Sequence, residues 1–204
     1  MSASDLSGHL ACAHLTELNL LALNGAMEFS TFTDPLLEIL QERGLEFERN
    51  YLEKLKAEGK TIIAEGDFLS AEKTIAAMRE GVDVIYQANL RKGLWWGRAD
   101  FLVKVDTPSE LGNWSYRVID AKLARETRTG TILQLCLYSE MIAEIQGAVP
   151  QFAYVITPEM NLHNMTTDST NLLHIIGGSK EGLRNAWQSL ARPGTPIHIP
   201  VLTV

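Results

Sequence analysis

Leucine and alanine recur at helical spacing in the first part of the sequence, and this pattern predicts two long helices. Residues 6–23 predict one continuous helix that ends at an Asn-Gly pair. A second helix is predicted at residues 34–59, where Asp34 is a suitable N-cap and Pro35 suits the first helical position. Gly44 interrupts the apolar stripe of this helix, which indicates either a bend or a close contact.

The hydrophobic period shortens after residue 60, where short apolar runs are separated by glycines and polar turns. The runs predict a strand, a helix, three strands, a helix and a last strand, at residues 61–64, 71–80, 82–88, 94–105, 116–123, 131–145 and 152–156. The core order of helix, three strands, helix and strand is typical of a compact α/β unit rather than of a regular βαβ alternation. Residues 161–179 are polar and are predicted to be irregular.

Composition limits the class of protein. A chain of 204 residues with 46% hydrophobic and 21% charged residues is typical of one globular domain. Its net charge of −7 argues against a protein that wraps nucleic acid through a generally basic surface. The sequence starts without the features of a signal peptide and lacks an apolar run of membrane-spanning length. We therefore expect a cytoplasmic protein with no membrane partner.

Charged residues interrupt two of the predicted strands. Asp120 and Lys122 flank Ala121, so their side chains point to the same side of the third strand. Such a pair is most often a simple ion pair. Asp100 lies in the neighbouring strand, however, and two strands can bring both aspartates within bridging distance. Two carboxylates repel, so one takes up a proton unless a cation lies between them. A hard ion such as Mg²⁺ suits these oxygens, and Lys122 is then placed to stabilise a phosphate oxygen or an attacking water.

The two helices beside this site supply further polar candidates. Glu48 on the long helix is a third carboxylate, and Glu46 is a near neighbour that the sequence does not separate from it. Gln134 and Tyr138 are spaced i, i+4 on the later helix and share a face. They form either the half-buried polar edge of a core helix or a hydrogen-bonding pair that orients Lys122 or contacts substrate.

These residues lie in four motifs that occur together and in a fixed order. On them the sequence resembles the PD-(D/E)XK nucleases, and most of all the RecB-like nuclease domains that often precede a helicase in longer chains. The resemblance spans residues 5–154. The motifs are Gly44-x-x-x-Glu48, Gly97-Arg98-Ala99-Asp100-Phe101-Leu102, Tyr116-x-Val118-Ile119-Asp120-Ala121-Lys122-Leu123 and Leu133-Gln134-Leu135-Cys136-Leu137-Tyr138.

The resemblance implies a fold and a set of site residues. The fold is a restriction-endonuclease-like α/β core of order αβββαβ, with a central mixed sheet flanked by helices. The nuclease domain covers residues 1–160, and residues 161–204 are a diverged or truncated C-terminal extension. The implied catalytic residues are Asp100, Asp120, Lys122, Gln134 and Tyr138. The implied metal ligands are Glu48, Asp100, Asp120 and the carbonyl of Ala121. The implied substrate-binding residues are Arg98, Lys122 and Tyr138.

The resemblance also implies an activity. A nuclease of this kind uses Mg²⁺ or Mn²⁺ to hydrolyse phosphodiester bonds in DNA, on single strands or at ends, in DNA repair, recombination or defence. A helicase is the expected partner, either as a separate protein or as a fused domain. The alternative is a DNA- or protein-binding module that keeps the fold while its active site decays. A more distant alternative is a toxin-like or RNA-processing nuclease with the same core.

Two departures from the family bear on the site. Many relatives carry a histidine directly before the glutamate of the long helix, and Phe47 occupies that place here. Either weaker metal binding or a site of carboxylates alone is expected as a result. Relatives with an iron–sulfur cluster use one early and three late cysteines. Cys12 matches the early position, but no cysteine follows Cys136, so no complete cluster is expected in this chain.

Overall fold

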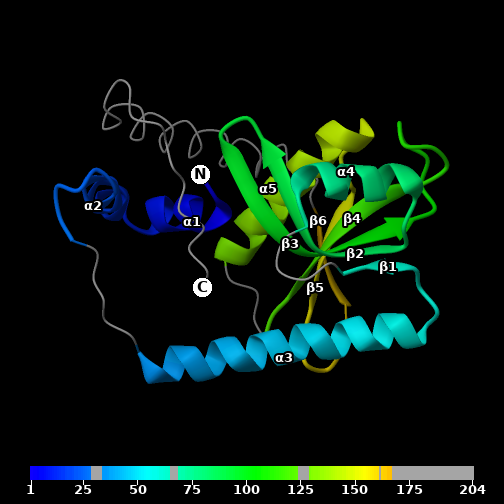
Figure 1. The fold of residues 1–204 in the computed structure, drawn as a ribbon, viewed down its shortest axis with the longest axis horizontal. Coiled ribbons are helices and arrows are strands. Elements are labelled where there is room, and N and C mark those ends of the chain that lie inside the picture. The colour runs from blue at the N-terminus through cyan, green and yellow to red at the C-terminus, as the bar shows by residue number, and fades with distance from the viewer. Residues whose placement is uncertain (29–33, 65–68, 124–128, 161, 167–204) are drawn as a thin grey trace.

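The chain forms three layers, in which helices cover both sides of one sheet (Figure 1). The computed structural model describes residues 1–28, 34–64, 69–123, 129–160 and 162–166. The helices are α1 (Ala3–Ala11), α2 (Ala13–Leu23), α3 (Pro35–Ala57), α4 (Ala71–Glu80) and α5 (Thr129–Gln146). The strands are β1 (Ile62–Ile63), β2 (Val84–Lys92), β3 (Trp95–Val105), β4 (Ser115–Ala121), β5 (Phe152–Ile156) and β6 (Leu162–Thr166). The general α/β class predicted from the sequence is confirmed.

The strands of the described residues form one mixed six-stranded sheet in the order β1-β2-β3-β4-β5-β6. β1 is parallel to β2 and β4 is parallel to β5, whereas the other neighbours are antiparallel. Parallel neighbours need a crossover connection, and α4 and α5 provide the two crossovers. From α3 to β5 the chain therefore contains the predicted helix, three strands, helix and strand, with β1 and α4 placed between α3 and β2.

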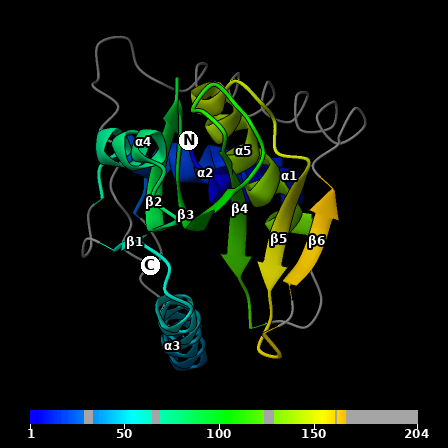
Figure 2. The same cartoon turned by 90° about the vertical axis from the view of Figure 1, so that its right-hand side faces the viewer.

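Each side of the sheet has its own apolar cluster. Helices α1, α4 and α5 cover one side, where Leu6, Met78 and Ile142 are completely buried. α3 crosses the other side and is seen end-on in Figure 2. There the ring of Tyr51 packs edge-on against Phe101, with 5.0 Å between the ring centroids. These two packed layers fix the positions of α3 and α5, the helices that carry the remaining polar candidates.

Only the second half of α3 packs on the sheet. The first half extends past the sheet (Figure 1), and its large apolar side chains are between 46% and 61% exposed. These side chains belong to Leu36, Leu37, Ile39, Leu40 and Leu45. Gly44 lies within the continuous helix, and a Cβ at this position would meet nothing within 4 Å. The close contact considered for Gly44 is therefore absent from the described residues.

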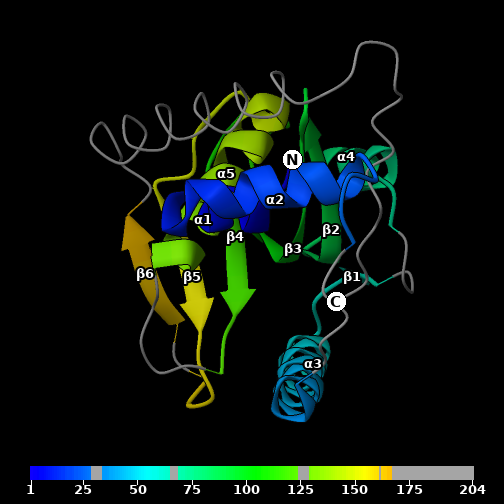
Figure 3. The same ribbon diagram turned by 90° about the vertical axis from the view of Figure 1, so that its left-hand side faces the viewer.

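Local sequence signals set several helix ends. The Asp34 carboxylate accepts a hydrogen bond from the backbone amide of Leu36 at 2.9 Å and caps α3 as predicted. The prediction of one helix at residues 6–23 is wrong, because Cys12 adopts extended backbone angles (φ −160°, ψ 104°) between α1 and α2. This break lets α1 turn its buried residues toward α5, against which α1 lies in Figure 3. No proline or glycine marks the break in the sequence.

The sheet divides between β3 and β4. β3 pairs with β2 from Trp95 to Val103, whereas β4 pairs with β3 only along its residues 115–119. From there β4 continues beside β5, through the pairs that Ile119–Ala121 make with residues 154–156. The first half of β3 therefore leaves β4, and the backbone amide of Trp96 donates instead to the carbonyl of Met1 at 2.9 Å. This division is called the fork below.

The last strand was not predicted. β6 pairs antiparallel with β5 along its whole length, although residues 161–179 are predicted to be irregular. Its sequence, Leu-His-Asn-Met-Thr, lacks the apolar alternation that marks a strand, and pairing at the edge of a sheet needs only backbone groups. Residue 161 and residues 167–204, which contain the rest of the predicted C-terminal extension, lie outside the described residues.

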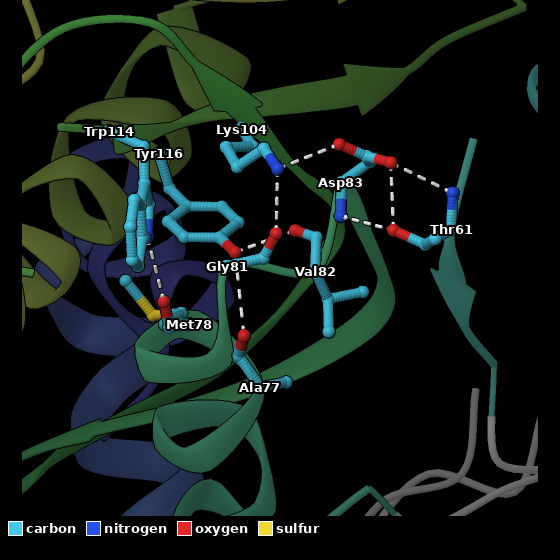
Figure 4. Close-up of polar contacts among 9 residues, drawn as sticks. All are labelled: Thr61, Ala77, Met78, Gly81, Val82, Asp83, Lys104, Trp114 and Tyr116. Atoms are coloured by element: carbon cyan, nitrogen blue, oxygen red, sulfur yellow. Dashed lines mark hydrogen bonds and ion pairs between the residues drawn. The ribbon is translucent and has the colours of Figure 1, made fainter. Parts of the chain in front are cut away.

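A polar network fixes the start of β2 against β3 (Figure 4). The ammonium group of Lys104 lies 2.9 Å from Asp83 Oδ1 and donates to the carbonyl of Gly81 at 2.7 Å. Asp83 Oδ2 accepts from both the backbone amide and the hydroxyl group of Thr61, at 2.9 and 2.7 Å. The Lys104 hydrogen bond and those from Thr61 hold the pKa of Asp83 well below its usual range. The network therefore joins three segments that are far apart in the sequence.

Two aromatic side chains extend this contact to α4 (Figure 4). Trp114 Nε1 donates to the carbonyl of Met78 at 3.0 Å, and the hydroxyl group of Tyr116 donates to the carbonyl of Val82 at 2.6 Å. Gly81 ends α4 with φ 73°, in the left-handed conformation that glycine adopts without a Cβ penalty. The end of α4 is thus held by Tyr116 of β4 as well as by Lys104 of β3.

Candidate active site

Asp100 and Asp120 lie opposite each other at the fork. The β3–β4 register ends with Phe101 opposite Ile119, and the next step of this register places Asp100 opposite Asp120. The backbone amide of Ala121 donates to Asp100 Oδ2 at 2.8 Å. If β3 and β4 stayed paired here, this amide would bind a backbone carbonyl of β3 instead. The predicted approach of the two aspartates is therefore present, and it depends on the separation of the two strands.

Asp120 is almost completely enclosed, with 1% of its surface exposed. Gln134 Nε2 on α5 donates to its Oδ1 at 3.1 Å, and the ammonium group of Lys122 lies 2.8 Å from its Oδ2. Lys122 is positioned by its own backbone amide, which donates to the carbonyl of Ile156 on β5 at 3.0 Å. Each oxygen of Asp120 therefore has a partner, and each keeps a second lone pair that can accept.

The electrostatics of the pair follow from burial and from its neighbours. Burial raises the pKa of Asp120, and the nearby Asp100 carboxylate raises it further, while Lys122 opposes both effects. Burial alone lowers the pKa of Lys122, but its attraction to Asp120 and Asp100 is stronger, and the resulting pKa is raised. Lys122 therefore remains an ammonium ion, and the two aspartates favour any additional cation placed between them.

Glu48 approaches the same region from α3. Its Oε2 accepts hydrogen bonds from Gln87 Nε2 at 2.5 Å and from the hydroxyl group of Tyr86 at 3.2 Å. Burial and then the charge of Asp100 raise the pKa of Glu48 to about 7. Glu46, the alternative that the sequence left open, is exposed to solvent. Of the two glutamates, Glu48 is the one near Asp100, whose charge acts on its carboxylate.

Tyr138 packs beneath the first half of β3. Burial raises the pKa of its hydroxyl group, as do the charges of Asp100 and Asp120, so the group stays neutral. A Cβ at Gly97 would overlap the Tyr138 ring, which explains why β3 has no side chain at this position. Arg98, the next residue, is exposed and lies opposite Asn89 on β2. Tyr138 therefore supports the strand that carries Asp100, and Arg98 faces solvent beside it.

The donor set at the fork suits a hard divalent cation. Asp100 and Asp120 offer carboxylate oxygens, and Mg²⁺ is commonly held by one or two carboxylates while it keeps several waters. Among the residues that the structure describes, no three His, Cys, Asp or Glu side chains converge into a metal-binding group. The two aspartates thus fit such an ion, while the roles of Glu48 and of the Ala121 carbonyl as ligands stay predictions.

Three residues next to the site add to what the sequence predicted. Phe47, which stands where many relatives of the resembled family carry histidine, is 7% exposed and packs in the apolar cluster with Tyr51. Tyr86 and Gln87 were not among the predicted site residues, although both bind Glu48. A signal for Gln87 exists in the sequence, because it is the polar residue that interrupts an apolar strand, as Asp100 does in the next strand.

Comparisons with family models and with curated protein sequences were made for this chain. No family model matches it, and no curated protein sequence matches it. Among the described helices, none combines the length and apolar character needed to cross a membrane. The resemblance to the RecB-like nucleases therefore stays a prediction from four motifs, and the function has to be argued from the geometry of the site.

Proposed function

We propose that this protein is a metal-dependent nuclease of the RecB-like PD-(D/E)XK type, which hydrolyses phosphodiester bonds of DNA on single strands or at ends. The observation that carries the proposal is the pairing of Asp100 with Asp120 at the fork, with Lys122 bound to Asp120. A buried carboxylate next to a second one is costly unless a cation is nearby. Here the cost falls at the fork between the two central strands of the sheet, where Asp120 is buried and Asp100 is partly exposed.

In the proposed mechanism each residue has a separate task. Asp100 and Asp120 bind the cation, and Gln134 keeps Asp120 in one orientation through its Oδ1. A divalent cation at this position supplies Lewis-acid stabilisation and lowers the pKa of a bound water. Lys122 stabilises the negative charge that develops on the phosphate when water adds to phosphorus and the phosphodiester P–O bond breaks.

Substrate and partners are proposed from charge. Arg98 is exposed next to Asp100 and is the proposed first contact with the DNA backbone. Because the whole chain carries a net charge of −7, its own electrostatic attraction to DNA is weak. A helicase partner or a fused helicase domain would supply the missing affinity and deliver a single strand or an end. We place this activity in the cytoplasm, in repair, recombination or defence.

One observation favours the alternative of a binding module without catalysis. Phe47, at the place where many relatives of the resembled family carry a histidine, offers no ligand atom and packs in the apolar cluster. Such a module would bind DNA or a protein through the same surface and would cleave nothing.

A cleavage assay separates the two functions. Labelled single-stranded and double-stranded DNA, with single-stranded RNA for comparison, is incubated with the purified protein in Mg²⁺, Mn²⁺ or EDTA. The nuclease proposal expects cleavage of DNA in either metal, none in EDTA, and none by Asp120→Asn. Binding of DNA without cleavage in any metal would support the module, and cleavage of RNA alone would support an RNA-processing enzyme.

A further inference from the structure

Gln87 lies at an irregular point of β2. Its φ is 51°, in the left-handed region, where an L-residue other than glycine is strained. The pairs on either side, Tyr86 with Phe101 and Ala88 with Ala99, belong to one unbroken register. Gln87 is therefore placed opposite Asp100, although the two make no pair of their own in the ladder.

The irregular point reverses the faces of β2. Before it, Val84 and Tyr86 lie on the side of the sheet that faces α3; after it, Ala88 and Leu90 lie in the opposite apolar cluster. In a regular strand, neighbouring side chains point to opposite faces. Here the side chains of two successive residues, Tyr86 and Gln87, both reach Glu48.

The two donors fix the orientation of one carboxylate. Both bind Oε2 of Glu48, at 3.2 Å from the Tyr86 hydroxyl group and 2.5 Å from Gln87 Nε2. A hydroxyl and an amide that hold the same oxygen leave the carboxylate little rotational freedom. The left-handed residue is what allows this, since a regular backbone at Gln87 would turn its side chain away from α3.

We infer that Gln87 is a positioning residue that holds Glu48 beside the Asp100–Asp120 pair for binding of a divalent cation, and that the strained backbone of β2 serves this placement. The inference rests on the proposed function and adds to it a residue outside the four motifs. Backbone strain next to a cluster of carboxylates is typical of functional sites. Residues that orient ligands in this way change metal affinity or activity by roughly 10–100-fold when removed.

The test uses substitutions that separate the side chain from the backbone. Gln87→Met keeps the length and removes the donor, whereas Gln87→Gly removes the side chain and relieves the positive φ. Gln87→Asn keeps an amide and tolerates the left-handed conformation but is too short to reach Glu48. Gln151→Met, at an exposed glutamine outside the site, is the matched control. For each variant the melting temperature in EDTA, the Mn²⁺ concentration at half-maximal thermal shift and the cleavage rate are measured.

Removing the Gln87 side chain should weaken Mn²⁺ binding without lowering the melting temperature of Gln87→Gly in EDTA. In EDTA, Gln87→Gly should melt at the parental temperature or roughly 2–4 °C above it. All three variants at Gln87 should need about 10–100-fold more Mn²⁺ for half of the thermal shift and should cleave at least about tenfold more slowly. The control should match the parent in all three measurements.

Three results would overturn the inference. If the Gln87 variants bind Mn²⁺ with the parental affinity, Gln87 has no positioning role, and the proposed function is unaffected. Lower melting temperatures in EDTA with unchanged Mn²⁺ affinity would make Gln87 a purely structural residue. A parent protein without any Mn²⁺ shift or cleavage would remove the proposed function and the inference together. Should Gln87→Met fail to fold, Gln87→Asn and Gln87→Gly still distinguish these results.

Discussion

Lys122 and Asp120 form one ion pair, but their proposed tasks differ. The carboxylate binds the cation before the reaction, whereas the ammonium group acts on charge that appears only as the phosphodiester is attacked. Lys122→Ala should therefore reduce the cleavage rate by at least about 100-fold, which is typical of losing a preorganised charge-stabilising donor. Single-turnover cleavage in Mn²⁺ measures this effect.

Metal binding provides the matched comparison for the same two residues. Calorimetry should show that Asp120→Asn abolishes most of the Mn²⁺-dependent rise in melting temperature, because a ligand is lost. Lys122→Ala should keep most of that rise. If the parent gains nothing from Mn²⁺, or if Asp120→Asn gains as much as the parent, the cation binds elsewhere or not at all.

The raised pKa of Glu48 predicts a pH dependence in the metal-free protein. Burial and the charge of Asp100 move this pKa from 4.5 to about 7, so the folded protein prefers the protonated carboxyl group. The free energy of unfolding should therefore fall as the pH rises from about 4.5 to about 7 and level off above that. At pH 8 in EDTA, Glu48→Gln should melt roughly 2–6 °C above the parent, and at pH 4.5 the two should nearly coincide.

Glu46→Gln is the control for this titration, because Glu46 is exposed on the same helix. It should keep the parental pH profile of the melting temperature. A parental profile in Glu48→Gln as well would show that another group titrates. Saturating Mn²⁺ should lessen the parent's loss of stability at high pH if Glu48 or its neighbours bind the ion.

The sequence predicted the charged members of the site better than their neutral partners. Asp100, Asp120 and Lys122 stand out because charge interrupts apolar strands, and the structure brings them together. Gln87 breaks its strand in the same way but carries no charge and belongs to no motif. Its importance follows from a backbone angle, which depends on the packing of both neighbouring strands rather than on the residue type.

At the scale of single elements, the contact between β3 and α5 limits which residues can replace Gly97. A Cβ at this position would overlap the ring of Tyr138, and both groups are held by well-packed surroundings. Gly97→Ala should destabilise the protein by about 1–3 kcal/mol and disturb the strand that carries Asp100. Thermal and urea unfolding of the purified variant measure the loss.

Gly44 on α3 offers the matched substitution. A Cβ there would meet nothing within 4 Å, and alanine is the better helix former, so Gly44→Ala should stabilise the protein by up to about 1 kcal/mol. Equal effects of the two alanines would contradict the contact between Gly97 and Tyr138.

The network around Asp83 predicts a different pH dependence. Its pKa is held below the usual range mainly by Lys104, so the ionised carboxylate stabilises the fold at neutral pH. This contribution is complete above the unfolded pKa of about 4 and is lost as the pH falls below it. Asp83→Asn should therefore cost about 1–3 kcal/mol at pH 7, with a smaller difference from the parent at pH 2–3. Chemical unfolding at both pH values tests this prediction.

Asp106→Asn is the control for Asp83, since Asp106 is an exposed aspartate just after β3. It should leave the stability near that of the parent at both pH values. A loss for Asp83→Asn that is equal at acid and neutral pH would assign the effect to packing rather than to ionisation.

The ends of helices and strands could be predicted where neighbouring residues in the sequence determine them. The N-cap Asp34 is a short-range signal and begins α3 as predicted, and α4 covers the predicted residues 71–80. The break at Cys12 has no such signal, because the docking of α1 onto α5 decides it. The strand β6 was missed for a similar reason, since its pairing partner supplies the order that its own sequence lacks.

At the scale of the whole molecule, the fork is the feature that no sequence pattern predicted. The strand order follows from short connections and crossovers, and it could be anticipated. The point at which β4 leaves β3 depends on contacts between β2, β3, β4 and β5 together. The sequence could therefore indicate that two aspartates lie on adjacent strands, but not that these strands separate beside them.

The exposed half of the fork also predicts how DNA binding depends on salt. Arg98→Ala should weaken binding to single-stranded DNA in Ca²⁺ by a few-fold, on any sequence, and should reduce the slope of log affinity against log salt by about one. Fluorescence anisotropy across a salt series measures both. Arg79→Ala, at an exposed arginine on α4, should leave the slope unchanged; an equal reduction there would show that binding is not localised at the fork.

The position of α1 has a consequence for the synthesis of the protein. Leu6 is completely buried in a cluster with residues of α5, yet α5 begins only at Thr129. A ribosome that adds about 5–20 residues per second needs on the order of 10 s to make the chain between them. During that interval the apolar side of α1 lacks the α5 surface that covers it in the folded protein and is open to chaperones. α1 therefore reaches its complete native packing only after a helix that is made more than 100 residues later.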